Sequence, residues 1–458
     1  MKIPETPPAL ENIFKELTLS TIQKMMGLAT NPLVTGRYLH WDKLKHHKVE
    51  GYSRDELWAA VKFQRLGVLK PISLKDKKGN PFRFCVPELV SQQLHLIDMG
   101  AGATIGVPEP ITNPQTKDKY LIRSLMEEAI TSSQLEGAAT TREAAKEMIR
   151  TGRPPRTTDE RMILNNFLTM QRITNLKTES LTPEMVFDIH KLVTHKTFPD
   201  LTAAGRFRRP DEKRFVGNDE GDVFHDPPPS EELEGRLKAM CDFANAKTPS
   251  FFIHPVIRAI ILHFWLAYDH PFWDGNGRTA RALFYWAMLH NGYWLFEFIS
   301  ISTILRKAPI KYGRSFLHTE TDENDLTYFI VAQTRVIQQA IAELHDYINR
   351  KSLEMRELES QIRSLDVFNH RQVDLIRHAL KHPYSHYSIE SHRSSHNIVY
   401  QTARTDLLDL ESRGILEKIR AGRKMMFGVP KDLPVRQRIF WGKGFLKINK
   451  KAKTPPAN

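Results

Sequence analysis

The stretch between residues 254 and 293 limits most strongly what this chain can fold into. Its first part, HPVIRAIILHFWLAYD, predicts an amphipathic helix from His254 to about Asp269, and RTARALFYWAMLHNGY later resumes a helical pattern. Between the two apolar runs stands HPFWDGNGRTAR, from His270 to Arg281. Two glycines among polar residues weaken a helix or a strand. The stretch therefore predicts a loop that leads into the start of a second helix.

Further helical patterns flank this pair. The segment KYLIRSLMEEAITSSQLEG places apolar residues at helical spacing and stops at Gly137, which suits a C-cap. The segment ENDLTYFIVAQTRVIQQAIAELHDYINR repeats isoleucine and leucine at the same spacing, with Asp325 suited to the N-cap. A bundle is the natural way to bury several such stripes, so we predict a mainly α fold.

The length of 458 residues is too great for one compact core, so several domains are expected. In the N-terminal part, the segment KDKKGNPFRFCV predicts a hairpin that turns at Gly79 and Asn80. The expected parts are a mixed α/β region at 1–110, a helical core at 111–350, a helical linker at 351–365, a winged-helix domain at 366–432 and a basic tail at 433–458.

One non-helical segment interrupts the helical core, GRFRRPDEKRFVGNDEGDVFHDPPP, from Gly205 to Pro229. Residues 214–216 and 223–225 are predicted to form two short strands joined by a turn, and the prolines end the second strand. A hairpin that protrudes from a helical body exposes strand edges, which must be protected or used for binding.

The winged-helix prediction rests on two helical patterns followed by two strands, at 415–420 and 424–429. The helix from Asn397 to Arg413 would lie in a DNA groove if this domain binds DNA. Basic side chains for phosphate contacts are Arg404, Arg413, Lys418, Arg420, Arg423 and Lys424. Negative charges on or beside this helix count against DNA, namely Asp406, Asp409 and Glu411. A wing for protein interaction or dimerisation is the alternative.

Composition restricts the class of protein. A hydrophobic content of 41% and a charged content of 26% are typical of globular proteins, and a net charge of +13 favours an anionic partner. No run of eighteen apolar residues and no apolar signal core occur, so we expect a cytoplasmic protein without a membrane partner. The two cysteines, Cys85 and Cys241, are far apart, which favours buried thiols over a disulfide framework or a zinc ribbon.

The loop HPFWDGNGRTAR has the composition of an anion site. It precedes a helix N-terminus, where unpaired N–H groups favour negative charge, and Gly275 and Gly277 allow phosphate oxygens to approach the backbone. Arg278 and Arg281 are three apart on one helix face, which suits a polyphosphate. The sequence contains neither a GxxxxGK[ST] loop nor a GxGxxG motif, so the phosphate site is of another kind.

Two further residues of the loop suggest chemistry. Asp274 offers an oxygen ligand for Mg2+ held by one carboxylate and substrate phosphates. His270, with an ordinary pKa near 6.5, can accept a proton from a hydroxyl nucleophile. A rival metal site is open on spacing alone, built from His263, Asp269, His270 and Asp274.

The whole stretch HPFWDGNGRTAR resembles the Fic signature, HxFx(D/E)GNGRxxR, and fits it at every position. The resemblance implies a helical Fic core and transfer of AMP from ATP to a Ser, Thr or Tyr hydroxyl of a protein. It implies that His270 is the general base, that Asp274 binds Mg2+ and that Phe272 is a buried anchor. It further implies a phosphate cradle of Asn276 with the Gly275 and Gly277 amides, while Arg278 and Arg281 hold the β and γ phosphates.

A second likeness lies at the end of the predicted helix 119–137. The residues SSQLEG resemble the Fic inhibitory motif, (S/T)xxxE(G/N), which precedes the core in class II members. The resemblance implies that Ser132 and Glu136 form a brake in which Glu136 pairs with Arg281 and displaces the γ phosphate. The hairpin at 205–229 stands where Fic proteins carry a flap that aligns the target, with Arg214, Phe215 and Val216 as expected contacts.

The sequence therefore predicts an autoinhibited protein adenylyltransferase that also modifies itself. One alternative is removal of AMP from a modified protein, with Glu136 positioning water. Another is a DNA-binding regulator whose Fic core senses nucleotide. Transfer of UMP, phosphocholine or phosphate, which some family relatives carry out, stays open, and so does a homodimer.

Overall fold

The computed structural model describes residues 2–16, 33–102, 114–217, 221–363, 368–381, 385–421 and 424–430. These fall into two compact units. The first comprises Met1–Ile105 and Leu121–Leu344, and the second comprises Gly106–Tyr120 and His345–Asn458. Among the described residues, no helix is long and apolar enough to cross a membrane.

The N-terminal region mixes short helices with one hairpin, as predicted. Its elements are α1 (Leu10–Glu16), α3 (Trp41–Leu44), α4 (Arg54–Val68), β1 (Lys70–Lys75), β2 (Pro81–Phe84), α5 (Glu88–Ile97) and the π-helix η1 (Asp98–Gly102). The predicted turn is present, because β1 pairs antiparallel with β2 and Gly79 adopts a φ of 85° between them. Helix α4 begins at a capping box of Ser53 and Glu56, which satisfies two amides of its first turn. Both cysteines are buried free thiols.

Ten helices form most of the described central region. They are α7 (Pro114–Leu135), α8 (Arg142–Thr151), α9 (Thr158–Leu176), α10 (Pro183–Val193), α11 (Leu233–Ala244), α12 (Pro255–Asp269), α13 (Asn276–His290), α14 (Ile301–Lys307), α15 (Pro309–Thr321) and α16 (Thr327–Arg363). Single 3-10 turns link some of them, at η2 (Leu201–Ala203), η3 (Ser230–Glu232) and η4 (Trp294–Glu297). The mainly α fold predicted from the sequence is confirmed.

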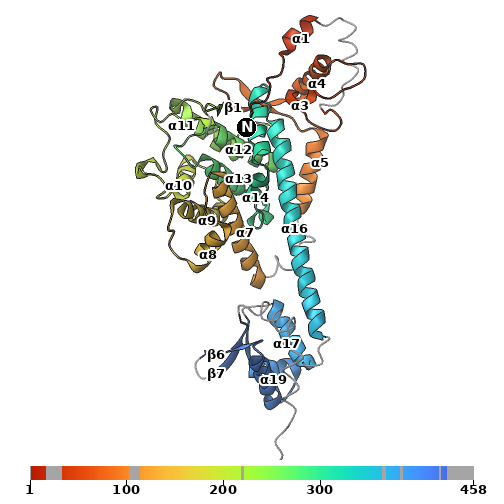
Figure 1. Ribbon diagram of the computed structural model, residues 1–458, viewed down its shortest axis with the longest axis vertical. Helices are drawn as coiled ribbons and strands as arrows, with labels where there is room; N and C mark the ends of the chain where they lie inside the picture. The colour runs from red at the N-terminus through yellow and green to blue at the C-terminus, as the bar shows by residue number, and fades with distance from the viewer. Residues whose placement is uncertain are drawn as a thin grey trace, which may run out of the picture. The chain divides into compact units, whose positions relative to one another are not determined.

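Helices α12 and α13 form the centre of this bundle. Nearly every residue of both is buried, and Figure 1 shows α9, α10 and α11 packed around them. Their apolar character on most faces explains this position, because a helix that is apolar all round must be covered on all sides. The loop that joins α12 to α13 is therefore held by a rigid core.

The hairpin of the central region is shorter than predicted. Strand β3 (Val216–Gly217) pairs antiparallel with β4 (Val223–His225), so that Val216 faces His225 and Gly217 faces Val223. Strand β4 has the predicted bounds, whereas β3 begins two residues later than predicted. The reason is that Arg214 turns back and donates a hydrogen bond to the Trp273 carbonyl.

The second unit contains α17 (His370–Lys381), β5 (His386–Ser388), α18 (Ile389–His396), α19 (Tyr400–Ser412), β6 (Glu417–Ala421) and β7 (Lys424–Gly428). Its antiparallel sheet has the order β5–β7–β6, and strand β5 was not predicted. The order of elements suits a winged helix, which stays a prediction. Arg423 and the basic tail at 433–458 lie outside the described residues.

Candidate functional site

The loop between α12 and α13 is closed by its own side chains. His270 ends α12 with a φ of 45°, and Gly275 precedes α13 with a φ of 81°, so two left-handed residues bracket the turn. The Asn276 side chain accepts a hydrogen bond from the Phe272 amide and donates one to the Phe272 carbonyl, each at 2.9 Å. Asn276 thus shapes the loop itself, in addition to the phosphate contact that the resemblance implied.

A histidine that the sequence analysis missed supports the loop from α10. His190 Nε2 lies 2.8 Å from the Asp274 carbonyl oxygen, and His190 Nδ1 accepts a hydrogen bond from the Gly205 amide at 3.0 Å. Burial lowers the pKa of His190 to about 4, so the ring is neutral with its proton on Nε2. The ring also stacks on Phe272 at 3.7 Å. His190 therefore fixes the backbone from which Asp274 projects.

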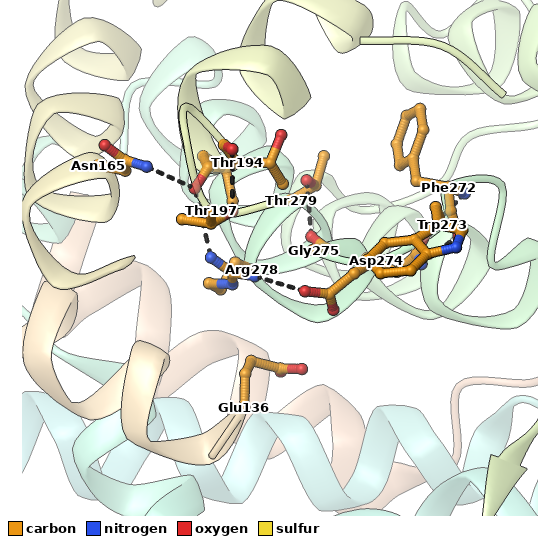
Figure 2. Close-up of polar contacts among 12 residues, drawn as sticks. Glu136, Asn165, Thr194, Thr197, Phe272, Trp273, Asp274, Gly275, Arg278 and Thr279 are labelled. Carbon is orange, nitrogen blue, oxygen red and sulfur yellow. Dashed lines mark hydrogen bonds and ion pairs between the residues drawn. The ribbon is translucent and has the colours of Figure 1, made fainter. Parts of the chain in front are cut away.

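Arg278 is a buried guanidinium with few partners. Its Nη2 lies 3.2 Å from Asp274 Oδ2 and its Nη1 lies 3.3 Å from the Val193 carbonyl oxygen, as Figure 2 shows for Asp274. Its Nε has no hydrogen-bond partner among the described residues. Burial lowers the pKa of Arg278, since the nearby carboxylates of Asp274 and Glu136 only partly offset the loss of solvent. The contacts of the Arg278 guanidinium are thus long and weak, which leaves this cation available to bind an anion.

Arg281 has strong partners on the last turn of α7. Its Nε donates to Ser132 Oγ at 2.8 Å, and its Nη2 donates to the Ser132 carbonyl at 2.9 Å and to Glu136 Oε1 at 2.7 Å. Burial raises the pKa of Glu136, but the charge and hydrogen bond of Arg281 outweigh burial and leave this pKa below its usual value. The structure thus brings Ser132 and Glu136 to Arg281, as the resemblance implied.

Glu136 also lies against the backbone of the anion site. Figure 2 shows its side chain projecting from the end of α7 toward Arg278. A Cβ atom on Gly277 would lie 2.1 Å from Glu136 Oε1, so only glycine leaves room for the carboxylate here. The Glu136 carboxylate therefore occupies space over the first turn of α13, where the amides would receive an anion.

Two residues outside the signature lie near Arg281 on another side. The charge of Arg281 acts on Tyr312 of α15, whose hydroxyl lies 2.8 Å from His263 Nε2 of α12. Burial raises the pKa of Tyr312 to about 12, so it keeps its proton. The sequence carried no signal for this contact, because it joins single residues of two helices that are distant in the chain.

His270 is partly buried. Burial lowers its pKa to about 4, which corrects the expected value near 6.5. Arg208 holds its backbone, donating from Nε to the His270 carbonyl at 3.0 Å and from its amide to the Pro271 carbonyl at 2.9 Å. The ring is therefore neutral over the physiological range and can accept a proton.

The rival metal site is wrong. His263 pairs with Tyr312, and Asp269 accepts hydrogen bonds from Arg236 and Trp265. Across the part of the chain that the structure describes, no three His, Cys, Asp or Glu side chains are gathered to hold a metal ion.

The three expected flap residues have different environments. Arg214 donates to the Trp273 carbonyl at 3.0 Å, and its guanidinium lies 4.3 Å from the centre of the Trp273 ring. It thus ties the hairpin to the loop, a contact that the sequence did not indicate. Phe215 is 53% exposed and Val216 is 38% exposed, which suits their expected role as target contacts.

Comparison with known proteins places this site in a family. Residues 180–288 match the model of the Fic/DOC family. A protein named Protein adenylyltransferase Fic from Nematostella vectensis is 37% identical over 117 residues, which are 26% of this chain and 25% of that protein. Proteins of the same name from Culex quinquefasciatus and Aedes aegypti are 33% and 32% identical over 117 residues, 26% of this chain and 21% of each relative. The chain thus spans about a quarter or less of these relatives.

Solved structures give weaker likenesses. A Fic family protein from Desulfovibrio desulfuricans is 17% identical with a TM-score of 0.49, over 76% of this chain and 97% of that chain. Fic-1 from C. elegans is 21% identical with a TM-score of 0.43, over 57% of this chain and 71% of that chain. The assignment therefore rests on the family model and the curated relatives.

The fold is that of a mainly α-helical protein whose two central helices are joined by a loop that leads into two buried arginines, Arg278 and Arg281. Residues 180–288 of this chain are a Fic domain, which confirms the prediction from the signature.

Proposed function

We propose that this protein is an autoinhibited protein adenylyltransferase, which transfers AMP from ATP to a Ser, Thr or Tyr hydroxyl of a protein, including its own chain. The observation that carries the proposal is the contact of Glu136 with Arg281 at the start of α13, beside a partly buried, neutral His270. The names of the curated relatives support the same reaction.

The anion site suits a triphosphate. Arg281 is 2% exposed and Arg278 is fully buried, so both guanidinium groups act where solvent screens charge poorly. A triphosphate would give Arg278 the strong partner that it lacks and would replace Glu136 on Arg281. The start of α13 adds free amides and the positive end of a helix dipole.

Asp274 is the residue that would hold Mg2+. Its side chain is 51% exposed, and its hard carboxylate oxygens fit an ion that also binds substrate phosphates. The ion supplies neutralisation of phosphate charge when it is bound. His190 serves this arrangement, because it fixes the backbone of Asp274.

His270 would act as the general base. It takes the proton of the target hydroxyl as the hydroxyl oxygen bonds to the α phosphorus of ATP. The bond between that phosphorus and the bridging oxygen breaks, and pyrophosphate leaves. AMP is then esterified to the protein, without a covalent enzyme intermediate.

Glu136 would act as the brake. A buried arginine without a partner is costly, on the order of 3–5 kcal/mol, so a carboxylate stabilises the empty site. ATP must displace Glu136 from both Arg281 and Gly277 before its γ phosphate reaches Arg281. The wild-type protein should therefore transfer AMP slowly.

The test compares wild type, Glu136→Gly and Glu136→Gly/His270→Ala with Mg2+ and α-labelled ATP, following label on protein. Strong labelling is expected only for Glu136→Gly. Labelling of the double variant would rule out His270 as base, and an unlabelled Glu136→Gly chain, also with UTP, would contradict nucleotidyl transfer. AMP removal uses the same two residues and needs a separate test. Protein labelled by the Glu136→Gly variant is incubated with wild-type protein, and the release of labelled AMP is measured.

DNA binding by the second unit is a second candidate function. The acidic residues that argued against it are neutralised within the fold. Asp406 is buried and bonded to Arg371, Asn369 and His392, Asp409 pairs with Arg413, and Glu411 pairs with Lys418. Arg404 on helix α19 thus has little unpaired acidic charge beside it.

Titration of labelled duplex DNA at several salt concentrations tests this candidate. Binding should weaken steeply with salt, and Arg404→Ala should weaken it further, whereas Arg172→Ala in the first unit should not. Equal affinity of the two variants and wild type would count against α19. A cytoplasmic location and a homodimer stay predictions from the sequence.

A further inference from the structure

Hydrogen bonds to backbone carbonyls, most of them from side chains, join the β3–β4 hairpin to the α12–α13 loop. Arg208, before the hairpin, bonds to residues 270 and 271, and Arg214 bonds to Trp273. His225, on β4, bonds to the carbonyl of Tyr268 through Nε2 at 2.7 Å. The loop that carries His270 is thus attached to both ends of the hairpin.

His225 also contacts an acidic side chain through its second ring nitrogen. Its Nδ1 lies 2.7 Å from Glu320 Oε2 of α15. A backbone carbonyl and a carboxylate are both acceptors, so both ring nitrogens must carry a proton for both bonds to form. A neutral imidazole has only one N–H and can form only one of them. The contact geometry therefore requires the imidazolium.

The surroundings of His225 favour this charge. Burial lowers its pKa, but the hydrogen bond and charge of Glu320 outweigh burial, so the pKa lies above the ordinary value. The charged and titratable groups that face it come from four segments: Lys77 of the β1–β2 turn, Asp226 of the hairpin, Glu320 of α15, and Tyr268, Asp269 and His270 at the end of α12. The open hollow beside His225 is lined further by Asp76, Lys78, Arg83 and Glu323.

We propose that His225 is a positioning residue, whose imidazolium locks β4 to α12 and α15 and so holds the hairpin edge at a fixed place relative to His270. Tyr268 is two residues before His270, and Val223 and Val216 lie on the same hairpin as His225. A protein segment that adds to this hairpin would then meet the base in a defined register. This use of the lock rests on the proposed function, but the lock itself does not.

The lock should depend on pH with a definite sign. A group whose pKa is raised on folding stabilises the fold fully below its unfolded value, near 6.5, and loses that effect as pH rises through the folded value. Above the folded pKa one of the two bonds is lost, and β4 is held less firmly. The hairpin should therefore loosen as pH rises through the folded pKa of His225, which lies above 6.5.

Glu320 offers a matched pair of variants. In Glu320→Gln the amide can donate to Nδ1 of a neutral ring, so both bonds survive without the charge. In Glu320→Ala the bond to Nδ1 is lost at every pH. The first variant should keep β4 firm and remove the pH dependence, and the second should leave β4 loose throughout.

The experiment combines histidine NMR with amide hydrogen exchange at pH 6 to 9. His225 should titrate above 6.5, and the protection factors of residues 222–226 should fall about tenfold as it does so. They should stay high in Glu320→Gln and low in Glu320→Ala. A His225 pKa at or below 6.5, or protection in wild type that does not vary with pH, would overturn the proposal.

A second measurement links the lock to target positioning. In the Glu136→Gly background, His225→Ala should lower label transfer to the chain by about tenfold or more while binding of Mg-ATP stays unchanged. Equal loss of Mg-ATP binding would show a general structural defect and refute a positioning role. If Glu136→Gly alone transfers no label, the proposed function fails, and NMR and exchange still decide whether the lock exists.

Discussion

Burial has opposite consequences for two residues of the site. It removes the charge of His270, whose pKa falls to about 4 because the loss of solvent outweighs the opposing charge of Glu136. It does not remove the charge of Arg281, since Ser132 and Glu136 supply oxygen acceptors at 2.7–2.9 Å. The site therefore combines a neutral base with a cation that already has an anionic partner.

The neutral state of His270 can be measured directly. We expect its ring to remain unprotonated at pH 5.5 in histidine NMR, where a free imidazole would be mostly charged. Glu136→Gly should lower its pKa further, because the Glu136 charge raises it. The spectrum of His270→Ala identifies the signal. A titration midpoint near 6.5 would show that the ring is solvated and would contradict the lowered pKa of His270.

At the scale of elements, α7 is fastened to the core eight residues before Glu136. Glu128 accepts hydrogen bonds from the Tyr285 hydroxyl of α13 at 2.9 Å, from the Ser300 hydroxyl at 2.8 Å and from the Ser302 amide of α14 at 3.1 Å. Its side chain is buried. The position of Glu136 on Arg281 thus follows from the docking of the whole helix.

Loss of this attachment should release the brake. Glu128→Ala removes the acceptor of the buried Ser302 amide and one of the two acceptors of the Tyr285 hydroxyl, which keeps the Ile299 carbonyl. Each buried donor left unpaired costs about 1–3 kcal/mol, so we expect a lower Tm and increased label transfer by a chain that retains Glu136. The control is Glu127→Ala, which removes a neighbouring carboxylate paired with Arg142 and Lys146 of α8. A folded Glu128→Ala chain that labels no better than wild type would contradict control through α7.

At the scale of the whole molecule, the chain comprises two compact units with separate cores. The second unit buries its own apolar cluster, which includes Ile376, Leu407, Leu410 and Phe427. Asp406 links α17, α18 and α19 of this unit through its bonds to Arg371, Asn369 and His392. We therefore expect the two units to unfold in separate steps.

Calorimetry of wild type and Asp406→Ala tests this expectation. Removal of one partner from a buried ionic cluster costs about 3–5 kcal/mol, which should lower the Tm of the second unit by ~10 °C or more. The transition of the first unit should not move, and label transfer by Glu136→Gly should be unchanged. A single transition that shifts as a whole would show that the units unfold together.

Features that depend on neighbouring residues could be predicted from the sequence. The helix–loop–helix around residue 270, the C-cap at Gly137 and the hairpin at 216–225 follow from local apolar spacing and from glycines, which act within a few residues. The signature identified the Fic domain for the same reason, since its residues are contiguous. The start of β3 was misplaced, because a contact with Trp273, distant in sequence, decides it.

Which distant side chains meet depends on the packing of the helices and could not be predicted from local patterns. Glu136 and Arg281 are 145 residues apart, and only a family resemblance, with no periodicity, related them. His190 and His225 gave no signal, because a single polar residue in a helix or strand carries no pattern. The pKa of His270 and the neutralisation of Asp406 depend on burial and on partners from other elements. Local structure thus depends on adjacent residues, whereas charge states and site geometry arise when packing removes solvent and brings distant groups together.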